Sequence, residues 1–343
     1  MKYKFYAKSE TAWDAMLKAI SGASKSIYLE MYILADNTQS HNFFETLKQK
    51  ARAGVKVKII IDVFGSLDMP AQTGAEIRLA GIELLFFSYW LQRTHKKILV
   101  VDEKTAFLGG VNIHKIFHKW NDLQILIEGP IAKSVLRSFA HTYRHCGGTD
   151  PDILRYDNQE IVLNKAKLWI LENWHLKQKR FLTRRYRESI INSRKSIIIT
   201  TPYFAPAKWL IGELHQAVLR GVDVQIVLPK KTDSRIMDRV NYFYLCRMHK
   251  LGVKFYLHKE MNHAKTMVVD DAEGVVGSQN IDQLSFDYNL EIGLFFREKE
   301  MIRDIGKIID GWKQASDVFV PVREPSWIDY LIVPIIRIYQ SLI

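Results

Sequence analysis

The chain has 343 residues, of which 48% are apolar and 25% are charged, a composition that is globular and excludes a disordered or collagen-like chain. Its 49 Lys and Arg residues outnumber 37 Asp and Glu residues, so the formal charge of +12 favours anionic partners, either nucleic acid or acidic lipid headgroups. The two cysteines, Cys146 and Cys246, exclude a disulfide framework, and no CxxC motif or Cys/His cluster indicates zinc.

The first elements in chain order alternate between strand and helix. No apolar run follows the charged residues 1–8, so we expect neither a signal peptide nor a membrane anchor there. An alternating run at residues 25–33 predicts a strand, and the spacing of Phe43, Phe44, Leu47 and Ala51 predicts a helix. A glycine turn then leads into a second apolar strand at 55–62, and a glycine precedes a third at 82–84.

The same order returns in the second half of the chain. Residues 195–203 repeat 25–33, residues 220–229 repeat 53–62, and residues 251–255 repeat 80–84, with a helix predicted by Leu210, Leu214, Ala217 and Val218. Strands that alternate with helices at this spacing predict βαβ units and a parallel-rich sheet covered by helices. We therefore expect one α/β unit that is duplicated head to tail.

The turn-rich segment 145–152 predicts the boundary between the two copies. This gives an N-terminal domain at residues 1–150 and a C-terminal domain at residues 151–343. In a molecule with such two-fold pseudo-symmetry, we expect the active site where the two halves meet.

A third repeated block contains residues suited to phosphate chemistry. Each copy has, in order, a histidine, a lysine, an aspartate, a glycine and an asparagine: His95, Lys97, Asp102, Gly109 and Asn112, then His263, Lys265, Asp270, Gly277 and Asn280. The glycine follows the histidine by 14 positions and the asparagine follows it by 17 positions in both copies. Strand alternation places each histidine and its lysine on one face. A single histidine on a strand usually has a structural role, but two complete copies indicate a site where a cation, amide donors and a nucleophile meet a phosphate.

These motifs resemble those of the phospholipase D superfamily, whose HxKx4D signature is followed by a Gly-Gly/Ser-x-Asn element. The resemblance covers nearly the whole chain and implies a duplicated α/β/α sandwich with pseudo-symmetric halves. Further segments are similar to bacterial cardiolipin synthases: Glu30-Met-Tyr-Ile, Asp62-Val-Phe-Gly-Ser66, Trp120-Asn-Asp122, Asn280-Ile-Asp-Gln-Leu-Ser-Phe286 and Asn289-Leu-Glu-Ile-Gly293. The length is similar to that of the compact synthase type without an N-terminal membrane hairpin.

The resemblance implies phosphodiester exchange in two steps, without a metal or another cofactor. It assigns His95 as the nucleophile that forms a phosphohistidine and His263 as the acid/base, while the near-symmetry leaves the reverse assignment open. An electropositive site is expected to keep the attacking imidazole unprotonated. The residues expected to hold substrate oxygens are Lys97, Lys265, Asn112 and Asn280, with Gly110 and Ser278 beside them. Asp122 and Glu291 are expected to orient the imidazoles, and Asp102 and Asp270 to brace the catalytic motifs.

The leading function is a phosphatidyl transferase that makes cardiolipin from phosphatidylglycerol and a second phospholipid alcohol. The alternatives are a phospholipase D that uses water as the acceptor, a nuclease or phosphodiesterase of the same superfamily, and a non-catalytic lipid-binding scaffold. Two intact motifs in one chain disfavour the scaffold and the small nucleases, which carry one motif per chain, so nucleic acid is not expected as a partner. The resemblance implies anionic phospholipid partners and a peripheral location on the cytoplasmic face of the bacterial inner membrane.

Three segments have two possible readings. Residues 327–343 form either an interfacial helix or a helix packed on the core. The basic run at 177–195 is either a solvated helix face or a surface that docks on an anionic membrane. In the aromatic segment 84–93 we expect Phe86 and Phe87 in the core, and Tyr89 and Trp90 at the rim of an acyl-chain entrance.

Overall fold

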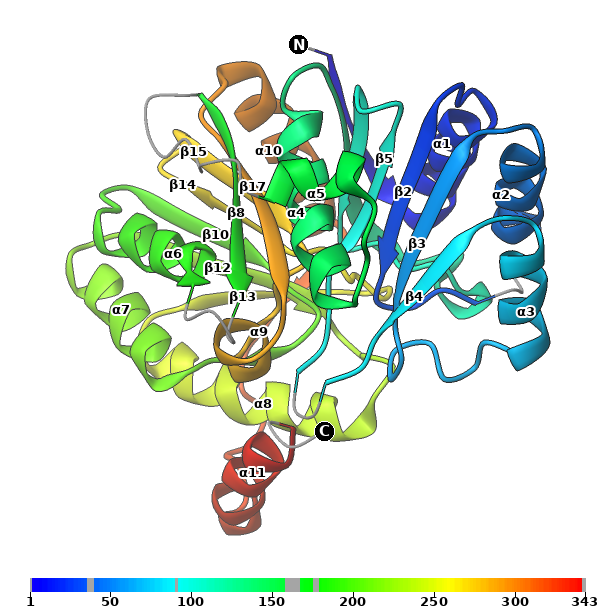
Figure 1. The fold of residues 1–343 in the computed structure, drawn as a ribbon. Coiled ribbons are helices and arrows are strands. Elements are labelled where there is room, and N and C mark those ends of the chain that lie inside the picture. Colours follow the sequence, from blue (N-terminus) through cyan, green and yellow to red (C-terminus); the bar gives the residue numbers. More distant parts are fainter. Residues whose placement is uncertain (1, 36–39, 90–91, 158–166, 175–178, 341–343) are drawn as a thin grey trace. The chain divides into compact units, whose positions relative to one another are not determined.

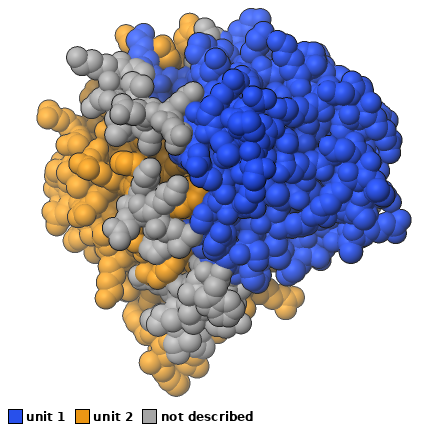
Figure 2. All heavy atoms as spheres, in the orientation of Figure 1, with its two compact units in different colours: residues 1–170 blue, residues 171–343 orange. Residues whose placement is uncertain are grey.

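The computed structural model describes residues 2–35, 40–89, 92–157, 167–174 and 179–340. It divides the chain into two compact units, residues 1–170 and residues 171–343 (Figure 2). The helix Pro151–Asp157 (α5) packs on the helix Ala132–His145 (α4), and both belong to the first unit. The domain boundary between residues 150 and 151 remains a prediction from the repeat.

Unit 1 contains a seven-stranded sheet with the order β1-β7-β6-β5-β2-β3-β4. Its strands are β1 (Tyr3–Lys8), β2 (Ser26–Met31), β3 (Lys56–Asp62), β4 (Glu83–Phe87), β5 (Lys97–Val101), β6 (Thr105–Gly109) and β7 (Asn121–Glu128). Its other helices are α1 (Ser9–Ser21), α2 (Phe43–Arg52), α3 (Ala71–Leu79) and the short 3₁₀ helix Lys115–Phe117.

The sheet is mixed, and the expectation of a parallel-rich sheet was wrong for part of it. Strands β2, β3 and β4 are parallel, while β2 pairs antiparallel with β5 and the pairs β5–β6, β6–β7 and β7–β1 are also antiparallel. Asp102 and Glu103 join β5 to β6, and both have a positive φ, which produces a tight hairpin turn. The βαβ pattern of the sequence therefore describes only the half of the sheet that contains β2 to β4.

Helices cover both faces of this sheet (Figure 1). On one face Trp13 and Met16 of α1 form a buried core with Ile27 and Leu29 of β2. On the other face the ring of Phe139 in α4 packs 5.4 Å from the ring of Tyr28, which also lies on β2. The successive residues of β2 thus face opposite helix layers, as strand alternation requires. The predicted α/β/α sandwich is confirmed.

Unit 2 repeats the order of unit 1 strand by strand. Its sheet has the order β18-β13-β12-β10-β14-β15-β17-β8-β9, which read backwards from β8 to β13 matches β1-β7-β6-β5-β2-β3-β4. The strands are β8 (Leu168–Trp174), β9 (Lys179–Arg180), β10 (Ser196–Thr200), β12 (Asp223–Pro229), β13 (Lys254–His258), β14 (Thr266–Val269), β15 (Glu273–Gly277), β17 (Glu291–Phe296) and β18 (Ser316–Val318). The helices are α6 (Phe181–Ile191), α7 (Lys208–Leu219), α8 (Arg235–Lys250), α9 (Gln283–Asp287), α10 (Lys299–Gln314) and α11 (Trp327–Gln340), and β11 (Phe204–Ala205) pairs with β16 (Ile281–Asp282). The predicted duplication is confirmed.

The helix α11 contacts the unit through α8 (Figure 1). Asp329 forms an ion pair with Arg239, the ring of Tyr330 lies 5.1 Å from that of Phe243, and Val333 is fully buried. Trp327, by contrast, is 73% exposed. Among the residues described, no helix has the length and apolar character needed to cross a membrane.

Candidate active site

In unit 1 the first motif lies at the start of β5, where His95 precedes the strand and Lys97 begins it. The ring of Tyr32, just after β2, lies 4.8 Å edge-on from the ring of His95 and 4.9 Å from the Nζ atom of Lys97. Lys96 points the other way, because its Nζ donates to the carbonyl of Ser138 and to the hydroxyl of Thr142 on α4. The predicted shared face of His95 and Lys97 is therefore present.

Asp62 fixes the backbone that leads into His95. Its carboxylate accepts hydrogen bonds from the backbone amide of Thr94 at 2.8 Å and from the amides of Phe64 and Gly65 at 3.0 Å. Burial raises the pKa of Asp62 to about 6, against the lowering effect of these hydrogen bonds. One carboxylate thus joins the turn after β3 to the residue before His95.

A second buried acid, Glu30, lies on the α4 side of the same strands. Its Oε1 accepts a hydrogen bond from the hydroxyl of Thr94 and lies 4.0 Å from the Nζ of Lys96, which is also fully buried. In the repeat of unit 2, Ala264 stands at the position of Lys96 and Thr200 at that of Glu30. This buried pair is thus a feature of the first motif and is not required by the fold.

Unit 2 holds the second motif in a related geometry. The Nζ of Lys265 lies 2.9 Å from Nδ1 of His263 and also donates to the backbone carbonyl of His263. Because an ammonium group only donates, Nδ1 accepts in this arrangement. The ring of Tyr203, which follows β10, lies edge-on at 6.3 Å from that of His263. Each histidine therefore has a lysine and a tyrosine from its own unit beside it.

The residues Asp122 and Glu291 occupy equivalent places, although they lie 27 and 28 positions after their histidines. The amide of Gly110 donates to the carbonyl after Asp122, and the amide of Ser278 donates to the carbonyl after Glu291. A Cβ atom on Gly110 would lie 2.2 Å from Oδ1 of Asp122, whereas the hydroxyl of Ser278 donates to Glu291. In the first copy, a glycine without a side chain thus lies beside the shorter acid, Asp122. In the second copy, a serine lies beside the longer acid, Glu291. The expected role of both acids in orienting the imidazoles remains a prediction.

The motif asparagines lie beside the chain segments that follow β2 and β10. The residue after Asn112, Ile113, donates its amide to the carbonyl of Ile33, the neighbour of Tyr32. In unit 2 the residue after Asn280 donates its amide to the hydroxyl of Thr201. The Oδ1 atoms of both asparagines are buried and have no hydrogen-bond partner within the described part of the chain. A buried Oδ1 atom without a partner can accept a hydrogen bond from a ligand, for example from a hydroxyl group.

The motif aspartates lie at the other end of their strands. Asp102 follows β5, and its carboxylate accepts hydrogen bonds from the amides of Ser24, Lys25 and Ser26. Asp270 follows β14 and accepts from the amides of Arg194, Lys195 and Ser196. Burial alone would raise the pKa of each carboxyl, but these hydrogen bonds lower the pKa of both below the usual range. Their geometry fits bracing of the strands.

Three residues near the motifs had no role assigned from sequence: Tyr32, Tyr203 and Asp62. Tyr32 and Asp62 lie within the segments that carry the family resemblance, and Tyr203 lies in the repeat of residues 25–33. Repetition and resemblance were therefore the available signals. They could not show which side chain in each segment reaches the histidine.

In the aromatic segment 84–93, one residue differs from expectation. Phe87 is buried as predicted, but Phe86 is 37% exposed because β4 is the edge strand, and the guanidinium of Arg78 lies over its ring. Tyr89 is partly buried and stacks on His145, and Trp90 lies outside the described residues.

In the basic run 177–195, Lys177 also lies outside the described residues. Several arginines of this run form ion pairs with acids: Arg180 with Asp287, Arg184 with Glu188, Arg185 with Glu273 and Arg187 with Glu213.

Across the described ranges, no group of three or more His, Cys, Asp or Glu side chains could hold a metal ion. The motifs themselves present imidazole, ammonium and amide groups. Two imidazoles can supply a nucleophile and a proton donor, and the ammonium and amide groups can stabilise negative charge on phosphate oxygens.

Known proteins share both the sequence pattern and the fold. The family described as "Cardiolipin synthase, PLD-like domain" matches residues 16–143 and again residues 186–312. The probable cardiolipin synthase YwiE of Bacillus subtilis is 26% identical over 336 residues, which cover 93% of this chain and 67% of the relative. Cardiolipin synthase A of Pseudomonas putida is 27% identical over 92% of this chain and 69% of its own length. The chain thus spans about two thirds of the length of these relatives. The crystal structure of phosphatidylserine synthase from Haemophilus influenzae has the same fold, with a TM-score of 0.77, 16% identity and coverage of 99% of this chain and 94% of that one.

Proposed function

Because this chain belongs to the family of PLD-like domains of cardiolipin synthases, we propose that it transfers a phosphatidyl group from one phospholipid to the hydroxyl group of another. The observation that supports this most is the duplicated motif: at the start of the equivalent strands β5 and β14, a histidine and a lysine lie next to a tyrosine. The NH₂ groups of the motif asparagines Asn112 and Asn280 would add neutral donors for phosphate oxygens.

The proposed reaction has two balanced steps. Nε2 of His95 attacks the phosphorus of phosphatidylglycerol, a P–N bond forms, and the P–O bond to glycerol breaks as His263 gives glycerol a proton. His263 then takes the proton from the hydroxyl of a second phosphatidylglycerol, whose oxygen attacks phosphorus and releases His95. The products are one cardiolipin and one glycerol. This proposal requires both histidines to act at one phosphorus atom.

The other residues near the motifs stabilise charge on the phosphate or position the histidines. Lys97 and Lys265 neutralise the non-bridging oxygens, whose charge rises in the transition state, and Asn112 and Asn280 donate to the same oxygens. Gly110 leaves room beside Asp122, whereas the hydroxyl of Ser278 donates to Glu291. In this proposal both acids orient the imidazoles. Asp62 is a positioning residue, since it acts on His95 through the backbone of Thr94.

The substrates proposed here require a membrane surface, and α11 offers an element for it. Trp327, Leu331 and Ile328 are 73%, 59% and 38% exposed, respectively, although all three are apolar. Apolar side chains on one exposed helix can insert at the lipid interface while the opposite side stays packed on α8. Peripheral attachment through α11 at the cytoplasmic face of the bacterial inner membrane follows as part of this proposal. The ion-paired arginines at 180–187 make the basic run the weaker candidate.

The product distribution tests the function. Purified protein incubated with phosphatidylglycerol vesicles should yield cardiolipin and glycerol in equal amounts, measured by lipid mass spectrometry and a glycerol assay. Phosphatidic acid in place of cardiolipin would identify a hydrolase. Cleavage of single-stranded DNA without lipid turnover would identify a nuclease.

A further inference from the structure

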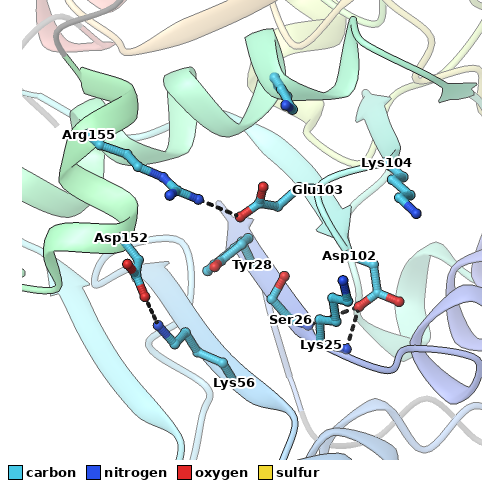
Figure 3. Close-up of a pocket in the computed structure, with 10 residues that line it drawn as sticks. Lys25, Ser26, Tyr28, Lys56, Asp102, Glu103, Lys104, Asp152 and Arg155 are labelled. Carbon is cyan, nitrogen blue, oxygen red and sulfur yellow. Dashed lines mark hydrogen bonds and ion pairs between the residues drawn. The ribbon is translucent and has the colours of Figure 1, made fainter.

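A concave site lies in unit 1, beside the turn that joins β5 to β6 (Figure 3). It has a volume of about 500 Å³, within the range of pockets that hold small organic ligands. Five basic residues line it: Lys25, Lys56, Lys104, Lys133 and Arg155. His95 precedes β5 and this pocket lies where β5 ends, so the pocket is separate from the first catalytic motif.

The acids of this pocket already have partners. Asp102 accepts backbone amides, as described above, and Glu103 accepts hydrogen bonds from the hydroxyl of Tyr156 at 2.6 Å and from Arg155 at 3.4 Å. Asp152 forms an ion pair with Lys56 at 2.8 Å. Each carboxylate is therefore used in holding the pocket together, and Figure 3 shows the contacts of Asp102 with Lys25, of Glu103 with Arg155 and of Asp152 with Lys56.

The positive charge that remains belongs to three lysines. The side chains of Lys25, Lys104 and Lys133 make no ion pair or hydrogen bond with any described residue, although all three line one hollow. The amide of Gly129 donates to the carbonyl of Lys104, which brings this turn next to the start of α4, where Lys133 lies. Ammonium groups gathered in this way repel one another, and a bound anion would relieve that repulsion.

The repeat keeps one of the pocket's cations and lacks two others. In unit 2, Lys195 stands at the position of Lys25, Ala272 at that of Lys104 and Asp223 at that of Lys56, whereas the bracing aspartates are the same in both units. The fold therefore does not require the cations at positions 104 and 56, which makes the basic pocket a feature of unit 1. Its buried lining includes Ser26 and Tyr28, whose hydroxyl groups can contact a polar ligand.

We propose that this pocket binds the phosphate group of an organic phosphate, which Lys25, Lys104 and Lys133 contact as point charges. The pocket is larger than a phosphate ion needs, so the ligand carries a polar group such as glycerol beside its phosphate. The same chemistry occurs in a free glycerol phosphate and in the headgroup of an anionic lipid. The proposal does not depend on the function proposed above.

Binding to the full chain tests this site. Glycerol 1-phosphate and inorganic phosphate are titrated into the wild type by calorimetry, and vesicles of phosphatidylcholine with and without phosphatidic acid are tested by co-sedimentation. The variant K25Q/K104Q/K133Q should bind glycerol phosphate or phosphatidic acid vesicles with an affinity at least about tenfold lower than that of the wild type. The control K8Q/K18Q/K307Q removes the same charge from exposed lysines outside the pocket and should bind like the wild type.

A second readout locates the ligand. Hydrogen exchange should slow in the peptides that cover residues 102–105 and 130–135 when the ligand is present, and H95N should show the same protection. The single variant K104A should fold normally, because unit 2 has alanine there, and should weaken binding less than the triple variant. Binding of glycerol 1-phosphate in solution would identify the ligand as a free organic phosphate. Binding only to vesicles that contain phosphatidic acid would identify it as a lipid headgroup. Unchanged affinity in the triple variant, or no saturable binding of any probe to the wild type, would overturn the proposal.

Discussion

At the scale of single residues, Asp62 shows how a side chain without a place in the motif can control it. Its three backbone hydrogen bonds need an acceptor at both carboxylate oxygens. In D62N the amide nitrogen would face one of these backbone donors, so Thr94 or the turn after β3 must shift. We expect kcat to fall by about tenfold or more, with a smaller change in KM, because a displacement of His95 by about 1 Å can have such an effect. D68N is the matched control, since Asp68 is an exposed acid in the turn after β3 whose side chain makes no hydrogen bond with a described residue. Equal kcat in D62N and D68N would contradict the positioning role.

The same carboxyl has a predictable effect on stability. Its pKa of about 6 in the folded state, against an ordinary 3.8, means that the folded chain holds this proton more tightly than the unfolded chain. The contribution of Asp62 to the free energy of unfolding is therefore largest below about pH 4 and falls as the pH rises to about 6, by up to about 3 kcal/mol. D62N lacks this titration, so its stability relative to the wild type should improve between about pH 4 and pH 7 in urea unfolding. If the free energy of unfolding of D62N relative to the wild type stayed constant or fell between about pH 4 and pH 7, this would contradict the raised pKa of buried Asp62.

Gly110 and Ser278 make a matched pair at equivalent positions. In G110S the new Cβ would collide with Asp122 at 2.2 Å, so we expect a fall in the melting temperature and a loss of activity of about tenfold or more. S278A keeps the Cβ and removes the hydroxyl that donates to Glu291 and accepts from the amide of Ile292, and its loss of stability should be about 1–3 kcal/mol. Thermal unfolding with activity per folded molecule separates the two. A G110S protein that matched the wild type would show that Asp122 is free to move.

Asp102 and Asp270 are predicted to act on folding more than on chemistry. D270N keeps the size of the side chain but places an NH₂ group toward backbone donors, which should lower the free energy of unfolding by about 1.5–3 kcal/mol. Activity per folded molecule at a permissive temperature should stay within about tenfold of the wild type. A stable D270N protein without activity would instead assign Asp270 to the reaction.

At the scale of elements, α11 presents one packed side and one exposed apolar side. W327E/L331E should reduce co-sedimentation with phosphatidylglycerol vesicles severalfold and leave the melting temperature unchanged, because both side chains are mostly exposed. L79E is the control, since Leu79 at the end of α3 is 87% exposed in unit 1. Vesicle binding equal to that of the wild type, or a loss of solubility in place of vesicle binding, would favour a helix that serves only the core.

Strand order explains which elements could be predicted from sequence. Period-two alternation and two copies at one spacing predicted the strands around the motifs and the shared face of each histidine and lysine. In unit 1 the structure has this shared face for His95 and Lys97. The exposure of Phe86 did not follow, because a short apolar run does not reveal that its strand is at the edge of a sheet. The antiparallel half of the sheet was missed for a related reason, since the hairpin at Asp102 and Glu103 lacks the glycine that marks such turns.

Long-range partners were the part of the site that sequence could not supply. The acids that neutralise the basic run come from Glu213, Glu273 and Asp287, far along the chain. The contact between Asp62 and Thr94 likewise joins residues 32 positions apart. Pairing of this kind depends on which strands become neighbours, and a local pattern does not specify it.

At the scale of the whole molecule, duplication accounts for the length and for part of the charge. Each unit has the same seven-strand order and one motif, and the differences between the units mark acquired features. Lys96 and Glu30 behind the first motif and Lys104 beside its hairpin have no counterparts in unit 2. We propose that part of the net charge, Lys97 and Lys265, serves phosphate chemistry and that another part lines the pocket of unit 1.

The central claim is that both histidines act on one phosphatidyl group. Cardiolipin formed from phosphatidylglycerol vesicles by the wild type, H95N and H263N tests it most directly, with lipid mass spectrometry as the readout. We expect the wild type to form cardiolipin and each single variant to be slower by at least about 10²- to 10⁴-fold, because each removes one required group. A folded H95N or H263N protein with cardiolipin synthesis close to the wild-type rate would contradict it.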